Sequence, residues 1–392
     1  MPYLNELGMI CALGDTHAAI TRRMLESPSC GVALSDACSP GRPLPLGRVL
    51  HDLPTDDHLR LSERSRNNRL ALAALNQIRP ALDAAIERHG RHRVGIVIGT
   101  STSGIAEGEA ALRQLAANGH LPATFHYGQQ ELGSPAVMLA SELGISGPAY
   151  VHSSACASSA KAMASAARLI RMGACDVVLT GGVDALCEFT VAGFAALESV
   201  SDRPCNPLSL HRKGINIGEG AALFLMSREP ATVALRGWGE SSDGYHISAP
   251  DPSGAGARQA IEQALARAGI GPAQIDYINL HGTATLQNDA MESRVVHALF
   301  GSTVPVSSTK PFTGHTLGAA GAIEAGLCWL AMQDTNAYGA LPPHLWDSVQ
   351  DPALPALRIA EPGARIGRPL RWALSNSFAF GGANAALVLG RE

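Results

Sequence analysis

The sequence is poor in charged residues. Asp, Glu, Lys and Arg together make up 16% of its 392 residues, and the formal net charge is −4. This balance excludes the strongly basic surface typical of proteins that bind nucleic acid. No uninterrupted apolar run is long enough to cross a bilayer and no signal peptide is visible, so we expect a cytoplasmic protein without a membrane partner.

Several common site signatures are also missing. The eight cysteines form no CxxC pair and no regular framework, which predicts reduced thiols rather than disulfides. HExxH and the zinc spacings of Cys and His do not occur, so we predict no metal site. No GxGxxG opens a βαβ unit, and no Gly-Lys-Ser/Thr follows the apolar run 94–99. Residue types alone leave a Ser/His/Asp hydrolase open, although no serine occupies a GxSxG elbow.

The composition, with 46% hydrophobic residues, is typical of a globular enzyme. The chain is longer than a domain with a single hydrophobic core usually is, so we expect two domains or two fused halves. Helical patterns alternate with apolar strands, which is typical of an α/β protein with a largely parallel sheet. The stretches 163–180 and 260–280 share one layout of helix, glycine break, apolar strand and glycine turn. This layout indicates an internal duplication, and we divide the chain into halves at 1–236 and 237–392.

Cys156 stands at the start of an alanine-rich segment, 157–172, whose apolar spacing predicts a helix. Unpaired N–H groups and the positive end of the helix dipole favour a thiolate there, and the thiolate is the nucleophilic form of cysteine. A buried structural cysteine is the alternative interpretation. The segment therefore offers a candidate nucleophile without deciding between the two roles.

Three further segments, 281–292, 307–318 and 376–384, follow expected strand ends, where an open α/β sheet places its chemistry. Either His281 or His315 alone could be a core histidine. Both, however, stand beside a Gly and a Thr at the end of an apolar run. Their joint occurrence makes a core role for both harder to accept.

Seven motifs, in order along the chain, resemble those of the β-ketoacyl-acyl carrier protein synthases, the elongating condensing enzymes of the thiolase superfamily. They are Gly99–Gly104 (GTSTSG), Ser154–Ser159 (SACASS), Gly218–Ala221 (GEGA), Ser241–His246 (SSDGYH), His281–Thr285 (HGTAT), Lys310–His315 (KPFTGH) and Asn376–Gly382 (NSFAFGG). The resemblance runs through nearly the whole chain. It implies the five-layered α/β/α/β/α thiolase fold, an α/β fold with two similar halves and the site between them.

The resemblance assigns roles to the reactive residues. Cys156 is similar to the cysteine that accepts the acyl group, and His281 and His315 to the pair that holds the thioester carbonyl of the extender unit. Lys310 matches the motif lysine, with Glu292 as its acidic partner. The implied reaction is the decarboxylative Claisen condensation of malonyl-acyl carrier protein with the acyl group on Cys156, which elongates a fatty acid or polyketide chain. Two imidazole donors would each stabilise the enolate by roughly 3–4 kcal/mol.

Other motif residues imply substrate binding. Thr283 and Thr285 match the hydroxyls that line the pantetheine channel. Phe380 matches the gating aromatic whose N–H forms the oxyanion hole together with that of the cysteine, and Phe378 and Gly381 belong to the same loop. No separate cofactor is implied, because the substrates are carried on the phosphopantetheine of an acyl carrier protein.

The family's carrier protein is acidic, which makes Arg64, Arg66 and Arg69 a hypothetical docking patch. A solvated helix face is the alternative interpretation of these arginines. The resemblance also implies pairing of subunits, as a homodimer or as a heterodimer with a catalytically silent partner similar to a chain-length factor.

Residues that depart from the usual family pattern indicate which branch of the family the chain resembles. Ala379 and Ala383 stand where the family usually has Gly and Thr. The loop 205–216 begins Cys-Asn-Pro, where fatty acid enzymes usually show Arg-Pro-Phe-Asp. This loop and the short N-terminus resemble the type II polyketide branch that makes aryl polyenes.

Three other functions were weighed against the condensing enzyme. A non-catalytic chain-length partner subunit is the main alternative, although relatives in that role lack the active cysteine. A thiolase would need a second reactive cysteine in a C-terminal glycine loop, and the only cysteine after Cys205 is Cys328, on an expected helix. The initiating synthases are similar to a Cys-His-Asn pattern, and asparagine stands at neither histidine position.

Overall fold

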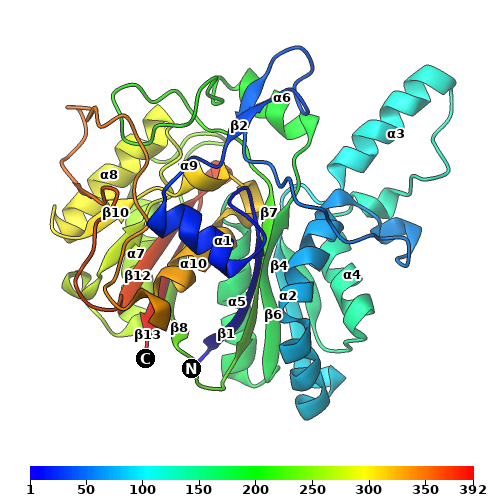
Figure 1. Cartoon of the computed structure of the whole chain (residues 1–392), viewed down its shortest axis with the longest axis horizontal. Helices are drawn as coiled ribbons and strands as arrows, with labels where there is room; N and C mark the ends of the chain where they lie inside the picture. The colour runs from blue at the N-terminus through cyan, green and yellow to red at the C-terminus, as the bar shows by residue number, and fades with distance from the viewer.

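Eleven strands form one mixed sheet with two halves of the same layout, in a computed structural model that describes residues 1–392 (Figure 1). The first half holds β1 (Tyr3–Ile10), β4 (Val94–Gly99), β5 (Ala149–His152), β6 (Val177–Asp184) and β7 (Gly220–Ser227). The second half holds β8 (Val233–Ser242), β9 (Tyr277–Asn279), β10 (Pro305–Ser307), β12 (Trp372–Phe378) and β13 (Ala383–Arg391), with β11 (Arg358–Ile359) at the edge beyond β10. The halves meet where Tyr3 of β1 pairs with Ala234 of β8.

The strand order is the same in both halves. It is β5-β4-β6-β7-β1 in the first half and β10-β9-β12-β13-β8 in the second. In each half the second strand in sequence is parallel to the third and the fourth, and the remaining pairs are antiparallel. This common topology confirms the internal duplication. The boundary expected at residue 236 falls inside β8, so the halves divide at the turn before Val233.

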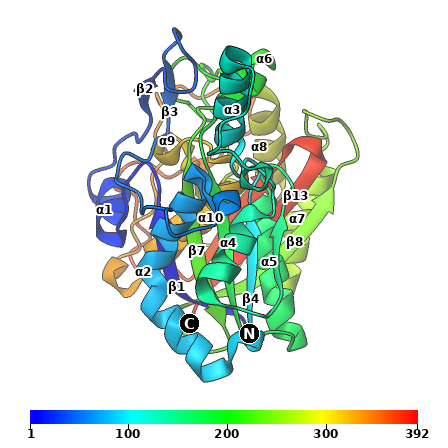
Figure 2. The same cartoon turned by 90° about the vertical axis from the view of Figure 1, so that its right-hand side faces the viewer.

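Helices complete the layers. They are α1 (His17–Thr21), α2 (Arg66–His89), α3 (Ile105–Asn118), α4 (Ser134–Leu143), α5 (Ser158–Met172), α6 (Glu188–Ala196), α7 (Ala255–Ala268), α8 (Leu286–Phe300), α9 (Lys310–Thr313) and α10 (Ala320–Ala331). α5 and α10 lie between the two halves of the sheet, whereas α2 and α4 cover one outer face and α7 and α8 the other (Figures 1 and 2).

The hydrophobic core follows these layers. A cluster of 45 buried residues surrounds α5 and α10, and clusters of 24 and 21 residues lie under the outer helices of the two halves. Since apolar area is buried on both faces of each half-sheet, the strands are almost continuously apolar. The five-layered arrangement expected from the resemblance is therefore confirmed.

The sequence explains how the central helix fits. Ala160, Ala164 and Ala167 of α5 are buried, and alanine combines high helix propensity with a side chain small enough to lie between two sheets. α5 ends at Gly173, which takes the left-handed conformation at φ +76°. The expected helix 157–172 is thus correct to within one residue.

The segment 28–60, expected as a surface excursion, is only partly exposed. It forms the hairpin of β2 (Ala33–Ser35) and β3 (Leu44–Leu46), and all three residues of β3 are buried. Gly47 lies so close to α9 that an added Cβ would stand 1.9 Å from the Thr313 carbonyl oxygen. The segment is therefore a cover over the turn that carries Lys310, a long-range contact that local composition does not reveal.

Candidate active site

Cys156 lies in a tight turn between β5 and α5. Ala155 takes a positive φ of 47°, and the Ser158 side chain accepts a hydrogen bond from the Ser154 N–H, which together shape the turn before the helix. The start of α5 is pressed against β4, because a Cβ at Gly99 would stand 2.3 Å from the backbone of Ser159. Packing thus fixes the sulfur at the N-terminal end of α5, as expected.

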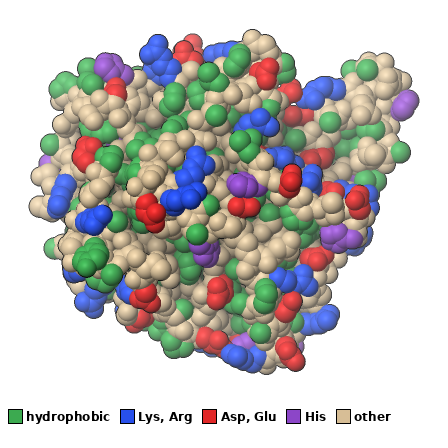
Figure 3. All heavy atoms as spheres, viewed as in Figure 1, with side chains coloured by type: hydrophobic (Ala, Val, Ile, Leu, Met, Phe, Trp, Pro, Cys, Tyr) green, Lys and Arg blue, Asp and Glu red, His purple; other side chains and the backbone are tan.

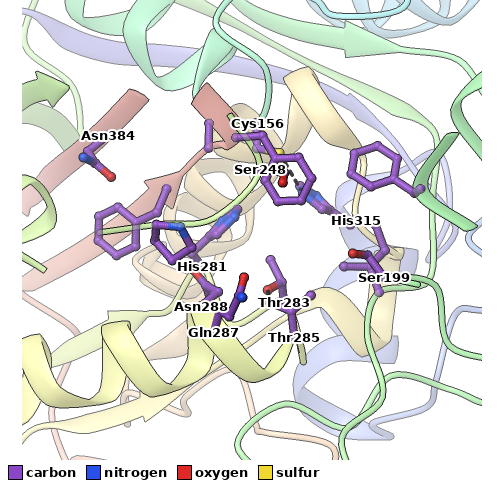
Figure 4. Close-up of a pocket in the computed structure, with 16 residues that line it drawn as sticks. Cys156, Ser199, Ser248, His281, Thr283, Thr285, Gln287, Asn288, His315 and Asn384 are labelled. Carbon is purple, nitrogen blue, oxygen red and sulfur yellow. Dashed lines mark hydrogen bonds between the residues drawn. The ribbon is translucent and has the colours of Figure 1, made fainter. Parts of the chain in front are cut away.

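The Cys156 side chain opens into a pocket between the two halves (Figure 4). Sixteen residues from both halves line it, and they include the two histidines and both threonines that the motifs singled out. The cysteine itself is 5% exposed. A pocket that reaches a nearly buried sulfur is a plausible entrance for a long, thin substrate arm.

The two histidines face the sulfur together. His315 Nε2 lies 3.0 Å from Cys156 Sγ, and the rings of His281 and His315 meet edge to face with centroids 5.3 Å apart. Both histidines lie more than a hundred residues after Cys156 in the sequence. The structure therefore assembles the constellation that the sequence analysis predicted.

Burial sets the protonation of these groups. It lowers the pKa of both His281 and His315 well below the usual value, with the Lys310 charge as the second cause, so both imidazoles are neutral. Burial also raises the pKa of the Cys156 thiol to about 12, although the Lys310 charge and the Phe380 N–H act in the opposite direction. The resting sulfur is thus a thiol next to a neutral base, and the thiolate expected from the helix dipole is outweighed by desolvation.

Glu324 is the acidic partner of Lys310, so the pairing with Glu292 expected from the motifs is wrong. Lys310 Nζ lies 2.5 Å from Glu324 Oε1, and both side chains are almost fully buried. Burial raises the pKa of the Glu324 carboxyl, and the Lys310 ammonium counteracts that rise. Glu324 was missed because it occurs in the apolar helix α10, 14 residues after the lysine and outside every motif.

Lys310 also fixes the tautomer of one histidine. Its Nζ stands 3.4 Å from His281 Nδ1. An ammonium group has no acceptor, so His281 Nδ1 must be the acceptor and Nε2 carries the proton. The Nδ1 of His315, by contrast, is buried without a partner, so no neighbour fixes its tautomer.

Glu292 holds the backbone beside His281. Its two carboxylate oxygens accept the His281 N–H at 2.8 Å and the Gly282 N–H at 2.7 Å, and the Asn376 amide donates to it at 3.2 Å. Burial outweighs these donors and raises the pKa of Glu292 to about 7. Glu292 is therefore a positioning residue for the His281 loop.

One backbone N–H group faces the sulfur, and a second one beside it has no backbone acceptor. The Phe380 amide points at Cys156 Sγ, and the Cys156 amide donates to no backbone carbonyl of the chain. The Phe380 ring packs on Phe194 of α6 at 5.5 Å between centroids, and Phe378 meets the His281 ring at 6.2 Å. Gly381 turns this loop at φ +79°. Phe194 carried no motif signal, since a Phe in an apolar helix is ordinarily a core residue.

The two threonines lie on one wall of the pocket (Figure 4). Their hydroxyls are 2.9 Å apart, and either oxygen can be the donor. One hydroxyl of the pair therefore keeps a proton to offer to a polar group in the channel.

Asp184 is a second residue that the sequence analysis missed. It lies fully buried at the end of β6 and accepts hydrogen bonds from the turn that follows β4, including the Thr100 hydroxyl at 2.6 Å. It also accepts the Gly318 N–H at 2.5 Å, three residues after His315. The carboxylate thus ties the first half to the histidine loop of the second.

The arginines proposed as a docking patch are all engaged within the chain, which gives each of them a structural role, and the docking patch stays a prediction. Arg66 forms a two-point ion pair with buried Glu219, at 2.6 and 2.8 Å. Arg64 and Arg69 donate to backbone carbonyls of the segment 53–59. These bonds fasten the segment 53–59 to the start of α2. In the view of Figure 3, basic and acidic side chains are interspersed.

The reactive atoms of Cys156, His281 and His315 lie within 4.8 Å of one another, close enough to share one soft metal ion. That the protein needs no metal therefore stays a prediction. None of the helices combines the length and apolar composition that crossing a lipid bilayer requires.

A five-layered fold with a cysteine and two neutral histidines in one pocket defines the class of thiolase-type condensing enzymes. Residues 55–231 match the family description "Beta-ketoacyl synthase, N-terminal domain", and residues 232–345 match "Beta-ketoacyl synthase, C-terminal domain". The chain belongs to the beta-ketoacyl synthase family, whose members are acyltransferases of the condensing type.

Similar proteins span the whole chain. Nodulation protein E of Rhizobium sp. (strain N33) is 32% identical over 98% of both chains, and 3-oxoacyl-[acyl-carrier-protein] synthase 2 of Staphylococcus aureus is 31% identical over 88% of this chain and 89% of its own. Among solved structures, the ketosynthase ApeO in complex with its chain length factor ApeC from Xenorhabdus doucetiae aligns with 46% identity and a TM-score of 0.92, covering 100% of this chain and 98% of the other.

Proposed function

We propose that the protein is a ketosynthase that stores an acyl chain on Cys156 and extends it with malonyl-acyl carrier protein. One observation carries the assignment of roles: the 3.0 Å approach of His315 Nε2 to Cys156 Sγ, beside a His281 whose proton Lys310 holds at Nε2. A chain-length subunit that catalyses no acyl transfer does not need a base beside a cysteine sulfur. The arrangement therefore favours the catalytic function over that alternative.

The first half-reaction transfers the acyl group. His315 Nε2 takes the proton of the Cys156 thiol as the sulfur attacks the acyl thioester, which makes the high pKa of the free thiol tolerable. The oxyanion of the tetrahedral intermediate is stabilised by the Cys156 and Phe380 N–H groups. When the intermediate collapses, the pantetheine sulfur leaves and takes the proton back from His315.

The second half-reaction forms the carbon–carbon bond. The carbonyl oxygen of the malonyl thioester accepts a hydrogen bond from His281 Nε2. It accepts a second one from His315 after the proton of that ring has moved from Nδ1 to Nε2, a change that no neighbour of Nδ1 opposes. Loss of carbon dioxide leaves an enolate whose negative charge these two donors stabilise. The enolate carbon attacks the acyl carbon on Cys156. The cysteine sulfur leaves as a thiolate and takes a proton from water, which restores the free thiol, and the β-ketoacyl chain ends on the carrier.

The pathway and partners follow from similarity rather than from the site. The 46% identity to a ketosynthase that was solved with a chain length factor supports a heterodimer of the same kind here. The loop 205–216 supports an aryl polyene product, with an acyl carrier protein delivering both substrates. We place this reaction in the cytoplasm, where all eight cysteines stay free thiols, and without any cofactor beyond phosphopantetheine.

The test is covalent loading. Incubation with an acyl-carrier protein should add one acyl group to the wild-type chain, located on the Cys156 peptide by mass spectrometry. Cys156→Ala should load nothing, whereas Cys328→Ala, a buried cysteine of α10 outside the pocket, should load normally. An acyl-enzyme that persists in Cys156→Ala would refute the assignment of the nucleophile.

A further inference from the structure

The strand β5 is an open edge of the sheet. It pairs only with β4, and its other side has no neighbour among the described strands. Its four residues are exposed or half-buried, so no helix covers the edge. An uncovered edge offers a row of unpaired N–H and C=O groups to the strand of another chain.

A cluster of cations lies on the same side of the molecule. The guanidinium groups of Arg168, Arg171 and Arg267 stand 5.8, 5.4 and 5.0 Å from the ring centre of Trp238. Two of these arginines belong to α5 and one to α7, and Figure 2 shows both helices beside β8. The Trp238 indole N–H is buried and has no acceptor, so the cluster holds an unused donor as well.

The cluster is continuous with the open edge. His152, the last residue of β5, lies within electrostatic range of Lys161, Arg168 and Glu240, all of which affect its pKa. The Tyr150 hydroxyl of β5 stands 2.7 Å from the Ser165 hydroxyl of α5. We call this surface, made of β5, the outer side of α5 and the Trp238 cluster, the edge face.

The charge of the edge face is one-sided. Lys161, Arg168, Arg171 and Arg267 are opposed only by Glu240, which pairs with Arg168. Partial burial lowers the pKa of Arg267, and the charges of Arg168 and Arg171 add to that decrease, so the arginines of the cluster repel one another in the isolated chain. The whole chain has a net charge of −4, so the edge face is opposite in sign to the molecule as a whole.

We propose that the edge face selects a partner subunit with an acidic complement beside its own free strand, and disfavours a second copy of this chain. A symmetric pair made through β5 would set the same basic surface against itself. Like charges brought together at an interface are a strong source of discrimination between partners. The proposal rests on the heterodimer named under the proposed function and assigns the residues that choose it.

The test mixes the wild-type chain with a charge-reversed variant of itself, which serves as the acidic partner. The double variant Arg171→Glu/Arg267→Glu keeps the fold and the edge strand but reverses the two exposed arginines that have no ion pair. A mixture of wild type and this variant should associate at least about tenfold more tightly at low salt than wild type does with itself. The matched control, Arg42→Glu/Arg365→Glu, changes the net charge equally at exposed sites elsewhere and should give no gain.

Raising the salt concentration should change the affinity of the two pairings in opposite directions. Raising salt from about 50 to about 500 mM should weaken the mixed pair and strengthen self-association of wild type, since screening removes attraction in one and repulsion in the other. Hydrogen exchange should show the amides of 149–152 protected in the mixed pair. A wild-type dimer that is tight and insensitive to salt, or a mixed pair that leaves these amides unprotected, would overturn the proposal. Neither readout depends on condensation, so failure of the catalytic assignment would be visible separately as lost acyl loading.

Discussion

The Lys310 ammonium and the Glu324 carboxylate form a 2.5 Å ion pair behind His281, with both side chains at most 3% exposed. The pair connects α9 of the histidine loop with α10 of the central layer. It keeps a positive charge beside His281 without exposing it to the pocket. The chemistry of the site thus depends on a carboxylate that does not touch the substrate.

Removing this carboxylate should destabilise the protein. Glu324→Gln leaves Lys310 buried without a counter-charge, and we expect the free energy of unfolding to fall by about 3 kcal/mol, as measured by urea denaturation. A double-mutant cycle with Lys310→Met should show strong coupling between 310 and 324. The same cycle between 310 and 292 should be close to additive; coupling as large as that with 324 would restore the Glu292 pairing.

The two histidines should separate in their effects. His281→Ala and His315→Ala should each lower the release of carbon dioxide from malonyl-acyl carrier protein by roughly 10²–10³-fold, because each removes one donor to the enolate oxygen. His315→Ala should also slow acyl loading of Cys156, since it removes the base 3.0 Å from the sulfur. Equal loading rates in the two variants would contradict the division of roles.

Lys310→Met should act through His281. Without the ammonium 3.4 Å away, His281 Nδ1 loses the neighbour that fixes its tautomer. We expect kcat for carbon dioxide release to fall by about tenfold to a hundredfold while KM for the extender changes little. A variant with unchanged kcat would show that the tautomer needs no such support.

Arg66→Ala should cost stability rather than affinity for the carrier. It leaves the buried Glu219 carboxylate without its two-point partner, and we expect a loss of about 2 kcal/mol in the free energy of unfolding. KM for the acyl-carrier should be unchanged, as it should be for the exposed control Arg42→Ala. A rise in KM confined to Arg66→Ala would support the docking patch.

The sequence was sufficient for the layers and for the reacting atoms. Periodic apolar spacing predicts α5 and α7 because these helices bury one face. The strand β4 is predicted residue for residue, because a short apolar run between polar segments is typical of a buried strand. Cys156, His281 and His315 were found since short motifs surround them. Their convergence, however, was inferred from resemblance and not from spacing.

The supporting residues lay beyond such reasoning. Glu324 and Asp184 are carboxylates in apolar stretches whose partners lie on other elements, so no local pattern distinguishes them. The arginines near the start of α2 looked free because their acceptors, backbone carbonyls of the preceding segment 53–59 and the distant Glu219 carboxylate, form no recognisable sequence pattern. Charge alone in a sequence does not tell whether a side chain faces a partner or its own chain.

His344 should make the protein sensitive to acid. Its Nδ1 accepts the Ser308 N–H at 3.0 Å, so its Nε2 donates to the Pro207 carbonyl at 2.9 Å, and burial lowers its pKa to about 4. Because the folded pKa lies below the usual 6.5, protons bind the unfolded chain more tightly. The neutral ring therefore contributes fully above pH 6.5, and about 3 kcal/mol should be lost as the pH falls towards 4.

Urea denaturation at several pH values between 7 and 4 measures this loss. His344→Gln keeps a polar side chain that does not titrate, so its stability should fall less steeply over this range than that of wild type, although His281 and His315 still contribute to the slope in both. The exposed control His120→Gln should keep the wild-type slope, because this side chain lies in solvent in the folded chain as it does in the unfolded chain. A slope in His344→Gln as steep as in wild type would mean that Ser308 and the Lys310 turn beside it do not depend on the neutral ring.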